Sequence, residues 1–170
     1  RAIKNKLSDF DIPVFTVPSL RQIINSEKRL DQIRPVNISE LLGREPIKPN
    51  KNLLSKSVDS QNVLVSGAGG SIGSEISHQI IKLKPKKLIL VELNEFALYK
   101  IYEELKNINQ NLKIIPLLVN VQNLSKIEHI FNIFNINTVY HAAAYKHVPL
   151  VEENICESVI NNVFGTLNVA

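Results

Sequence analysis

The sequence of 170 residues contains no methionine, no tryptophan and a single cysteine, Cys156. One cysteine cannot form a disulfide within the chain, which suits a reducing compartment. We expect Cys156 to be a buried small apolar side chain rather than a nucleophile. No set of His, Cys or carboxylate residues has metal-ligand spacing, so the sequence predicts no metal site.

Long apolar runs are also absent. No uninterrupted apolar stretch approaches the roughly 18 residues that span a bilayer, and no signal peptide is apparent. Apolar residues make up 44% and charged residues 21%, the profile of a globular domain, which we expect in the cytoplasm. Because the chain starts at Arg1 without a methionine and ends on an apolar-periodic stretch, we expect it to be a fragment of a longer protein.

The positive charge is unevenly distributed. Residues 1–60 hold 11 Lys/Arg and 7 Asp/Glu, whereas residues 61–170 hold 9 of each. The N-terminal charges are scattered, without the clustering and the aromatic or glycine interleaving that nucleic-acid binding requires. Nucleic acid is therefore not an expected partner.

The chain divides into two parts of different character. Residues 1–57 lack a repeating strand–helix rhythm, with short helical patterns near 19–30 and 37–42 followed by Pro46 and Pro49. We interpret this part as a connector or arm without a core of its own, and residues 58–170 as the N-terminal part of one domain.

From residue 62 onward, apolar β-branched runs alternate with amphipathic stretches. Strands are expected at 62–67, 86–92, 113–121 and 137–144, and helices at 71–84, 94–108, 125–134 and 149–170. Apolar strands that alternate with helices predict an α/β fold with a doubly wound parallel sheet, covered on both faces. In the usual dinucleotide-binding order, the four strands lie 3-2-1-4, which is the first half of a Rossmann fold.

The helical spacing makes three local predictions. The first helix should bury Ile72, Ile76, Ile80 and Leu83, and the second should bury Phe96, Tyr99, Tyr102 and Leu105. The third should open with a capping box between Ser125 and Glu128. Within the fourth strand, we interpret His141 as a core histidine with satisfied hydrogen bonds.

The turn after the first strand carries the motif of greatest functional interest. Gly67, Gly70 and Gly73 have G-x-x-G-x-x-G spacing between a strand and a helix. In that context the first glycine permits a tight exit, the second allows close approach of a diphosphate, and the third lets the helix pack on the sheet. Free N–H groups at Ser71 and Ile72 would face the phosphates. The alternative is a purely structural turn.

The second strand ends at Glu92, 19 residues after Gly73. An acidic residue at this place accepts hydrogen bonds from the hydroxyls of the adenosine ribose. A 2′-phosphate would meet the carboxylate there, so we predict NAD rather than NADP. The alternative is a solvated glutamate at the end of a strand.

The fourth strand runs into three small residues, Ala142, Ala143 and Ala144, with Lys146 and His147 just beyond. This strand should end beside the first one, at the switch point where the crevice opens. Small side chains let the cofactor lie against the backbone, and we expect Lys146 to reach its phosphate or ribose. Alternatively, Lys146 snorkels at the strand end. His147 either faces the sugar or caps a loop.

Four segments together resemble one family: SGAGGSIGSE, ELNEFALY, HAAAYKHVPLVE and NNVFGTLNVA. They are similar to the nucleotide-sugar 4,6-dehydratases of polysaccharide biosynthesis, in the extended branch of the short-chain dehydrogenase/reductase superfamily. The resemblance is to the large membrane-anchored form that acts on UDP-N-acetylglucosamine, and it covers residues 58–170. Residues 12–50 resemble the connector that precedes this domain, through VPSL and LLGREP.

The resemblance implies a redox-neutral lyase. Hydride passes from sugar C4 to NAD, water leaves from C5 and C6, and the hydride returns to C6. The product would be a UDP-4-keto-6-deoxy-N-acetylhexosamine, a precursor of bacterial surface glycans. The resemblance also implies a homo-oligomer when intact, with a nucleotide sugar as its substrate. Such proteins are anchored to the inner membrane, with this domain in the cytoplasm.

The resemblance also assigns individual residues. Asn120 and Val121 stand where the family has Asp-Val, whose aspartate accepts a hydrogen bond from the adenine amino group. An asparagine carbonyl can accept that bond without charge assistance. Lys146 matches a lysine that contacts NAD in the related epimerases, and Asn162 matches a cofactor-touching asparagine in N-x-x-G-T. Ser66 replaces the usual threonine before the glycine motif.

No catalytic acid or base is placed within this chain. The family supplies these groups from beyond the fourth strand and its helix, after residue 170. Tyr102 and Lys106 have suitable chemistry, but they fall on the second expected helix, far from the crevice. Two alternatives stay open: a nucleotide-sugar 4-epimerase, which shares this half-domain, and a non-catalytic NAD-binding module.

Overall fold

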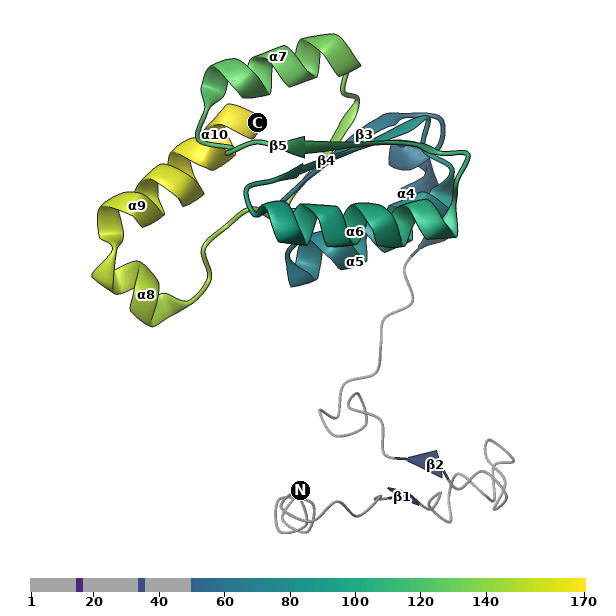
Figure 1. The fold of residues 1–170 in the computed structure, drawn as a ribbon, viewed down its shortest axis with the longest axis horizontal. Helices are drawn as coiled ribbons and strands as arrows, with labels where there is room; N and C mark the ends of the chain where they lie inside the picture. Colours follow the sequence, from purple (N-terminus) through teal and green to yellow (C-terminus); the bar gives the residue numbers. More distant parts are fainter. Residues whose placement is uncertain (1–14, 17–33, 36–49) are drawn as a thin grey trace. The chain divides into compact units, whose positions relative to one another are not determined.

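The computed structural model describes residues 15–16, 34–35 and 50–170 of the chain (Figure 1). The first two stretches pair as antiparallel strands, β1 (Phe15–Thr16) and β2 (Arg34–Pro35). The other features that we expect before residue 50 lie outside the described residues. The unit that contains the main sheet comprises Asn50–Ala170.

This unit alternates strands and helices as the sequence predicts. Its elements in chain order are α4 (Lys51–Val58), β3 (Asn62–Ser66), α5 (Ser71–Ile80), the 3₁₀ turn η1 (Ile81–Leu83), β4 (Lys87–Glu92), α6 (Glu95–Ile108), β5 (Lys113–Leu118), α7 (Leu124–Phe134), β6 (Thr138–His141), α8 (Val148–Glu153), α9 (Ile155–Val159), the π-helical turn η2 (Ile160–Phe164) and α10 (Gly165–Val169). Among these described elements, no helix has the length and apolar character needed to cross a bilayer.

The four strands form one parallel sheet in the order β5-β4-β3-β6. This is the predicted 3-2-1-4 order, so the Rossmann-like fold class is confirmed. The central strands β3 and β4 contribute apolar side chains with no exposed surface to both faces. Each such valine, leucine or isoleucine stabilises the fold by about 1.5–3 kcal/mol. The continuous apolar runs are thus explained by helices on both sides of the sheet.

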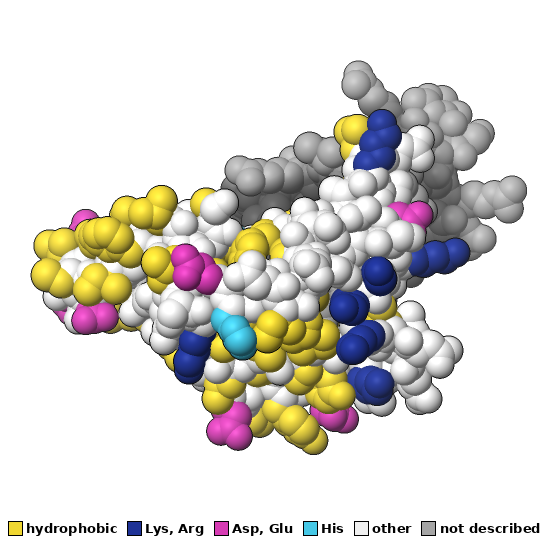
Figure 2. Space-filling view, turned by 90° about the horizontal axis from the view of Figure 1, so that it is seen from above, with side chains coloured by type: hydrophobic (Ala, Val, Ile, Leu, Met, Phe, Trp, Pro, Cys, Tyr) yellow, Lys and Arg dark blue, Asp and Glu magenta, His cyan; other side chains and the backbone are white. Residues whose placement is uncertain are grey.

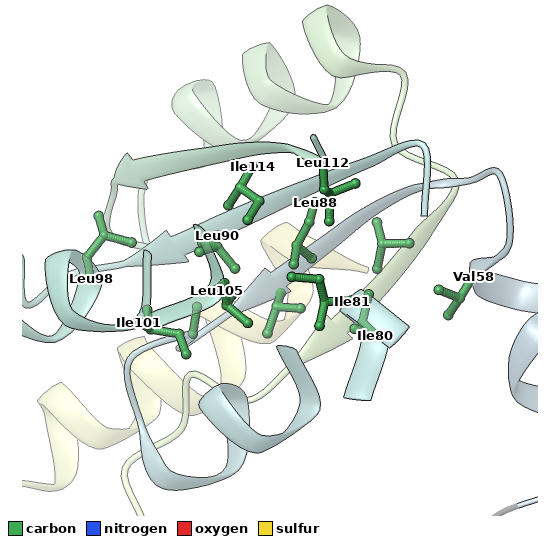
Figure 3. Packing of buried hydrophobic residues seen from close by; sticks show 13 residues of the cluster. Val58, Ile80, Ile81, Leu88, Leu90, Leu98, Ile101, Leu105, Leu112 and Ile114 are labelled. Carbon is green, nitrogen blue, oxygen red and sulfur yellow. The ribbon is translucent and has the colours of Figure 1, made fainter. Parts of the chain in front are cut away.

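Two core clusters lie on opposite faces of the sheet. On one face, Val63 and Val65 of β3 and Leu88 and Leu90 of β4 pack with α5, η1 and α6. Figure 3 shows the β4 leucines of this cluster with side chains from the helices. On the other face, Leu64 packs with residues of β4, α7 and α10.

Helix α4 is an element of the sheet unit that the sequence pattern does not predict. Asn50 caps it by accepting hydrogen bonds from the N–H groups of Asn52 and Leu53. Val58 is fully buried in the first core cluster, and the Thr138 hydroxyl donates to the Ser57 carbonyl at 2.6 Å. These contacts join α4 to the sheet unit rather than to the connector expected at 1–57.

The predicted faces of two helices were partly wrong. In α5, Ile80 is buried as expected, but Ile72 is 63% exposed. In α6, Leu105 is buried, whereas Phe96 and Tyr99 are 76% and 62% exposed. A second stripe, Leu98, Ile101 and Leu105, packs on the sheet instead. Both stripes satisfy helical spacing, and the branched aliphatic side chains interlock with the valine and leucine rows of the strands.

Two further local expectations were wrong. Helix α7 begins at Leu124 because Asn123 caps it, accepting from the N–H of Lys126 at 3.1 Å. Ser125 donates its hydroxyl to the Asn123 side chain rather than forming a capping box. Cys156, on α9, is exposed rather than buried.

Candidate functional site

The carboxyl ends of all four strands meet at one edge of the sheet, where the connecting loops form a crevice. Two cavities open there, with volumes of about 600 Å³ and about 430 Å³. They share Gly70, Ala142, Ala144 and Tyr145 as lining residues. The two cavities are therefore halves of one crevice, centred between β3 and β6 at the predicted switch point.

Gly67 and Gly73 are required by the fold itself. Gly67 has φ +65°, and a Cβ there would lie 2.6 Å from the Ala142 carbonyl oxygen. A Cβ on Gly73 would overlap the Gly67 carbonyl oxygen. Only glycine permits this turn and the close packing of α5 beneath it.

Gly70 is different, because the protein leaves space for a side chain. A Cβ added to Gly70 would have the Gly67 oxygen as its nearest heavy atom, at 3.3 Å, and the φ of Gly70, −72°, suits any residue. The empty space faces both cavities. A side chain here would fill the cradle, so glycine keeps the backbone accessible to a ligand.

Helix α5 begins directly beneath this cradle. Gly70 is its N-cap residue and supplies no side-chain hydrogen bond. The N–H groups of the first helical turn, at Ser71 and Ile72, therefore have no capping side chain, and both residues line the larger cavity. Free N–H groups and the positive end of the helix dipole make this a favourable place for a phosphate.

Glu92 ties the glycine turn to the end of β4. One carboxylate oxygen accepts from the Gly69 N–H at 2.9 Å, and the other accepts from the N–H groups of Leu93 and Asn94 at 2.8 and 3.1 Å. The spacing alone did not reveal the bond to Gly69. The oxygen that accepts from Gly69 retains a lone pair for a ligand hydroxyl, whereas the other oxygen already accepts two hydrogen bonds, and Glu92 lines the smaller cavity.

Asn120 and Val121 lie at the far wall of the same smaller cavity. The Asn120 side-chain oxygen accepts from the Gln122 N–H at 2.9 Å, which fixes the amide in the loop after β5. Val121 is buried in the second core cluster and contributes an apolar surface. The arrangement suits a flat ring lying on Val121, with the Asn120 carbonyl at its edge.

The loop after β6 forms the wall common to both cavities. The Ala142 N–H donates to the Ser66 carbonyl at 3.0 Å and extends the pairing with β3 by one residue. Lys146 and His147 line the larger cavity. Tyr145 lines both cavities, and the sequence reasoning missed it. Its position between predicted site residues was the available signal.

Asn162 contacts this loop rather than lining either cavity. Its side-chain oxygen accepts from the Tyr145 N–H at 2.8 Å, and its NH₂ group donates to the Tyr145 carbonyl at 3.0 Å. The neighbouring Asn161, also missed, is buried and donates to the Ala143 carbonyl at 3.1 Å. The π-helical turn η2 turns both asparagines toward the loop. A contact between Asn162 and a cofactor stays a prediction.

His141 joins β6 to β3 and to α10. Its Nδ1 lies 2.6 Å from the Ser66 hydroxyl, and its Nε2 lies 3.1 Å from the Thr166 hydroxyl. Because Thr166 donates its own proton to the Asn162 carbonyl, we assign the ring proton to Nε2. Burial lowers the pKa of His141 below its usual 6.5, which favours the neutral ring. The interpretation as a hydrogen-bonded core histidine agrees with this geometry.

The structure places Tyr102 and Lys106 outside the crevice, and it gathers no metal-binding cluster within the described residues. Tyr102 packs against the first core cluster from α6, and the Lys106 ammonium donates to the Gln110 carbonyl at 3.3 Å. Neither lines the crevice. Within the described part of the chain, the structure gathers no three His, Cys or carboxylate residues into a metal-binding arrangement. The metal-free prediction stays a prediction.

The profile of a family described as "Polysaccharide biosynthesis protein" matches residues 63–170. The chain belongs to this family. The capsular polysaccharide biosynthesis protein CapD of Staphylococcus aureus is 39% identical to it over 168 residues, which cover 98% of this chain and 28% of CapD. The uncharacterized membrane protein MJ1061 of Methanocaldococcus jannaschii is 36% identical over 116 residues, or 68% of this chain and 33% of MJ1061.

More distant relatives extend the comparison. The UDP-N-acetylglucosamine 4,6-dehydratase (inverting) of Campylobacter jejuni is 27% identical over 112 residues, 65% of this chain and 32% of that protein. The X-ray structure of Pen from Bacillus thuringiensis aligns with a TM-score of 0.59 and 33% identity, covering 66% of this chain and 34% of Pen. The chain thus spans about a third or less of each of these proteins.

Proposed function

We propose that the crevice binds NAD. The observation that carries this proposal is Gly70, which the fold does not require as glycine but whose missing side chain opens the space above the N–H groups of Ser71 and Ile72. The diphosphate would lie in this space, against Ala142, Ala143 and Ala144. These residues fit a dinucleotide because they leave the backbone amides accessible.

Each of the two cavities would hold one half of the cofactor. The adenosine half fits the smaller cavity, where Glu92 would accept hydrogen bonds from the ribose hydroxyls and the Asn120 carbonyl would face the adenine amino group. The nicotinamide half fits the larger cavity, where Lys146 would donate to a phosphate or ribose oxygen. When bound, NAD would supply a reversible hydride acceptor.

We further propose that the intact protein is a nucleotide-sugar 4,6-dehydratase that acts on UDP-N-acetylglucosamine. Three observations support this: the family, the Campylobacter relative named for that activity, and the space left in the larger cavity beside His147. The residues of this chain would bind cofactor and orient the sugar. The acid and base that move protons would come from outside residues 1–170, so this chain alone would be inactive.

The reaction is tested by product analysis on the intact protein. UDP-N-acetylglucosamine is incubated with enzyme, and the products are examined by mass spectrometry and NMR. Loss of one water with a 4-keto, 6-methyl sugar is the expected result. An inverted hydroxyl at C4 without loss of water identifies a 4-epimerase instead, and unchanged sugar with retained NAD binding identifies a non-catalytic NAD-binding module.

We also propose that the intact protein is a membrane-attached homo-oligomer whose sheet unit lies in the cytoplasm. The relative MJ1061 is described as a membrane protein, which supports attachment. A cytoplasmic position would place the crevice where nucleotide sugars are available. Fractionation of cells that express the intact protein, followed by crosslinking, tests both parts of this proposal.

A further inference from the structure

The edge of the sheet opposite the crevice is rich in lysine. The amino ends of the strands and the loops before them carry Lys82, Lys84, Lys86, Lys87 and Lys113. Figure 2 shows dark-blue side chains gathered at the right of the view, with a magenta side chain beside them, and further magenta side chains at the left end and along the lower side. Lys82, Lys84, Lys86 and Lys113 are exposed, and Lys87 is half-buried. We call these five residues the lysine edge.

The fold places these lysines close together. Lys87 and Lys113 are register partners at the first position of β4 and β5, so two like charges stand side by side on neighbouring strands. Hydrogen bonds from the Ser60 N–H to the Lys84 carbonyl and from the Lys86 N–H to the Gln61 carbonyl hold the preceding loop at the same edge. Like charges at directly opposed positions are destabilising, so an uncharged residue at either position would make the fold more stable.

Little negative charge lies nearby. Asp59 is the acidic residue in the loop that enters β3, and within residues 50–170 no carboxylate pairs with the lysine edge. Glu104 of α6 lies 3.6 Å from His78 instead. The opposite end carries Glu92 at the end of β4, Glu95 at the start of α6 and three glutamates on α8 and α9, against the single lysine Lys146 of the crevice. The sheet unit is therefore positive at its amino edge and negative around its carboxyl edge.

We propose that the lysine edge docks on a membrane surface that contains anionic phospholipids. This inference rests on the membrane attachment proposed above. Residues 50–170 contain no arginine, the side chain best suited to bidentate recognition of individual phosphates. Lysines spread along an edge suit the diffuse negative potential of lipid headgroups. The aromatic side chains expected of a nucleic-acid surface do not interleave with them.

The proposed docking has a functional consequence. The strands run from the lysine edge to the crevice, and a six-residue strand such as β4 is about 20 Å long. With the lysine edge on the lipid, the crevice would open away from the membrane, toward the aqueous phase. Helix α4 leads into β3 at this same edge of the sheet.

The test measures binding of the chain to lipid vesicles by co-sedimentation. Vesicles of phosphatidylcholine alone are compared with vesicles that contain about 30% phosphatidylglycerol, at low and high salt. Because one lysine near such a surface contributes about fivefold to binding, Lys86→Gln with Lys113→Gln should weaken binding to the anionic vesicles about 25-fold. Lys86→Arg with Lys113→Arg should retain it.

The matched control is Lys100→Gln with Lys126→Gln, which removes the same charge from exposed positions outside the lysine edge. It should weaken binding less than threefold. Equal weakening by both pairs, or equal binding to neutral vesicles, would overturn the proposal. Tighter binding to a single-stranded oligonucleotide than to anionic vesicles would overturn it as well. NAD titration of the same variants separates this result from the proposed function, because neither pair touches the crevice.

Discussion

Gly70 and Gly73 stand three residues apart in one motif, yet the structure predicts opposite effects when each is changed to alanine. At Gly73, the added Cβ would overlap the Gly67 carbonyl oxygen and lie 2.7 Å from its carbonyl carbon. Backbone atoms cannot move aside as a flexible side chain can. We therefore expect Gly73→Ala to destabilise the fold by about 3 kcal/mol, the upper end of the usual overpacking cost.

At Gly70, the added Cβ would meet the Gly67 oxygen at 3.3 Å, a contact relieved by a shift of a few tenths of an ångström. Alanine is a poorer N-cap residue than glycine, which destabilises the folded state by about 1 kcal/mol or less. Alanine also lowers the conformational entropy of the unfolded chain, which stabilises the fold by about 1 kcal/mol or less. Gly70→Ala should therefore fold normally. Its methyl group would hold the diphosphate away from the backbone amides, so that one charge-assisted hydrogen bond is lost. Such a bond contributes about 1.5–3 kcal/mol, and its loss weakens NAD binding roughly 10- to 150-fold.

The assay combines thermal unfolding with calorimetric titration of NAD. For a chain of this length, about 3 kcal/mol corresponds to roughly 6–12 °C in Tm, so Gly73→Ala should unfold at clearly lower temperature. Gly70→Ala should keep its Tm within about 3 °C and lose affinity. If Gly70→Ala bound NAD as tightly as the unchanged chain, the assignment of the cradle to a diphosphate would be refuted.

Three further predictions concern side chains around the crevice. Replacing Lys146 by alanine should weaken NAD binding at least about tenfold, as measured by calorimetry, because one charge-assisted hydrogen bond is lost; unchanged affinity would exclude this contact. NADP should bind more weakly than NAD, because its 2′-phosphate would meet the Glu92 carboxylate, and equal affinities in parallel titrations would argue against that placement. Burial lowers the pKa of His141, so its contribution to stability is present above pH 6.5 and is lost as the pH falls through the folded-state pKa. The drop in Tm between pH 7.5 and pH 5.5 should therefore be smaller in His141→Gln, and an equal drop would contradict the neutral assignment.

The sheet could be predicted from the sequence because its strands are buried on both faces. A run such as Leu88–Val91 is apolar at every position and fully buried, so it has one structural interpretation. The helices are different. In α6, the stripe through Phe96 and Tyr99 and the stripe through Leu98 and Ile101 both have helical spacing. The sheet surface decides between them, and that surface exists only after folding.

The candidate site could likewise be predicted only in part from the sequence. The glycine turn could be located from spacing alone, because a strand, a tight turn and a helix are contiguous in the chain. The Asn161 and Asn162 contacts to the loop after β6 depend on a π-helical turn that has no distinct sequence pattern. The hydrogen bond from Gly69 to Glu92 joins residues 23 positions apart. Such contacts follow from the arrangement of elements rather than from local sequence.

The most direct test of the central claim is an NMR titration of the isotope-labelled chain with NAD. The proposed binding mode predicts that the amide signals of Gly70, Ser71 and Ile72 shift progressively and saturate, together with those of Leu93 and Lys146. Signals from the lysine edge, such as Lys113, should stay in place. No shift at the glycine turn at millimolar NAD, or shifts confined to another surface, would contradict the assignment of this crevice as a dinucleotide site.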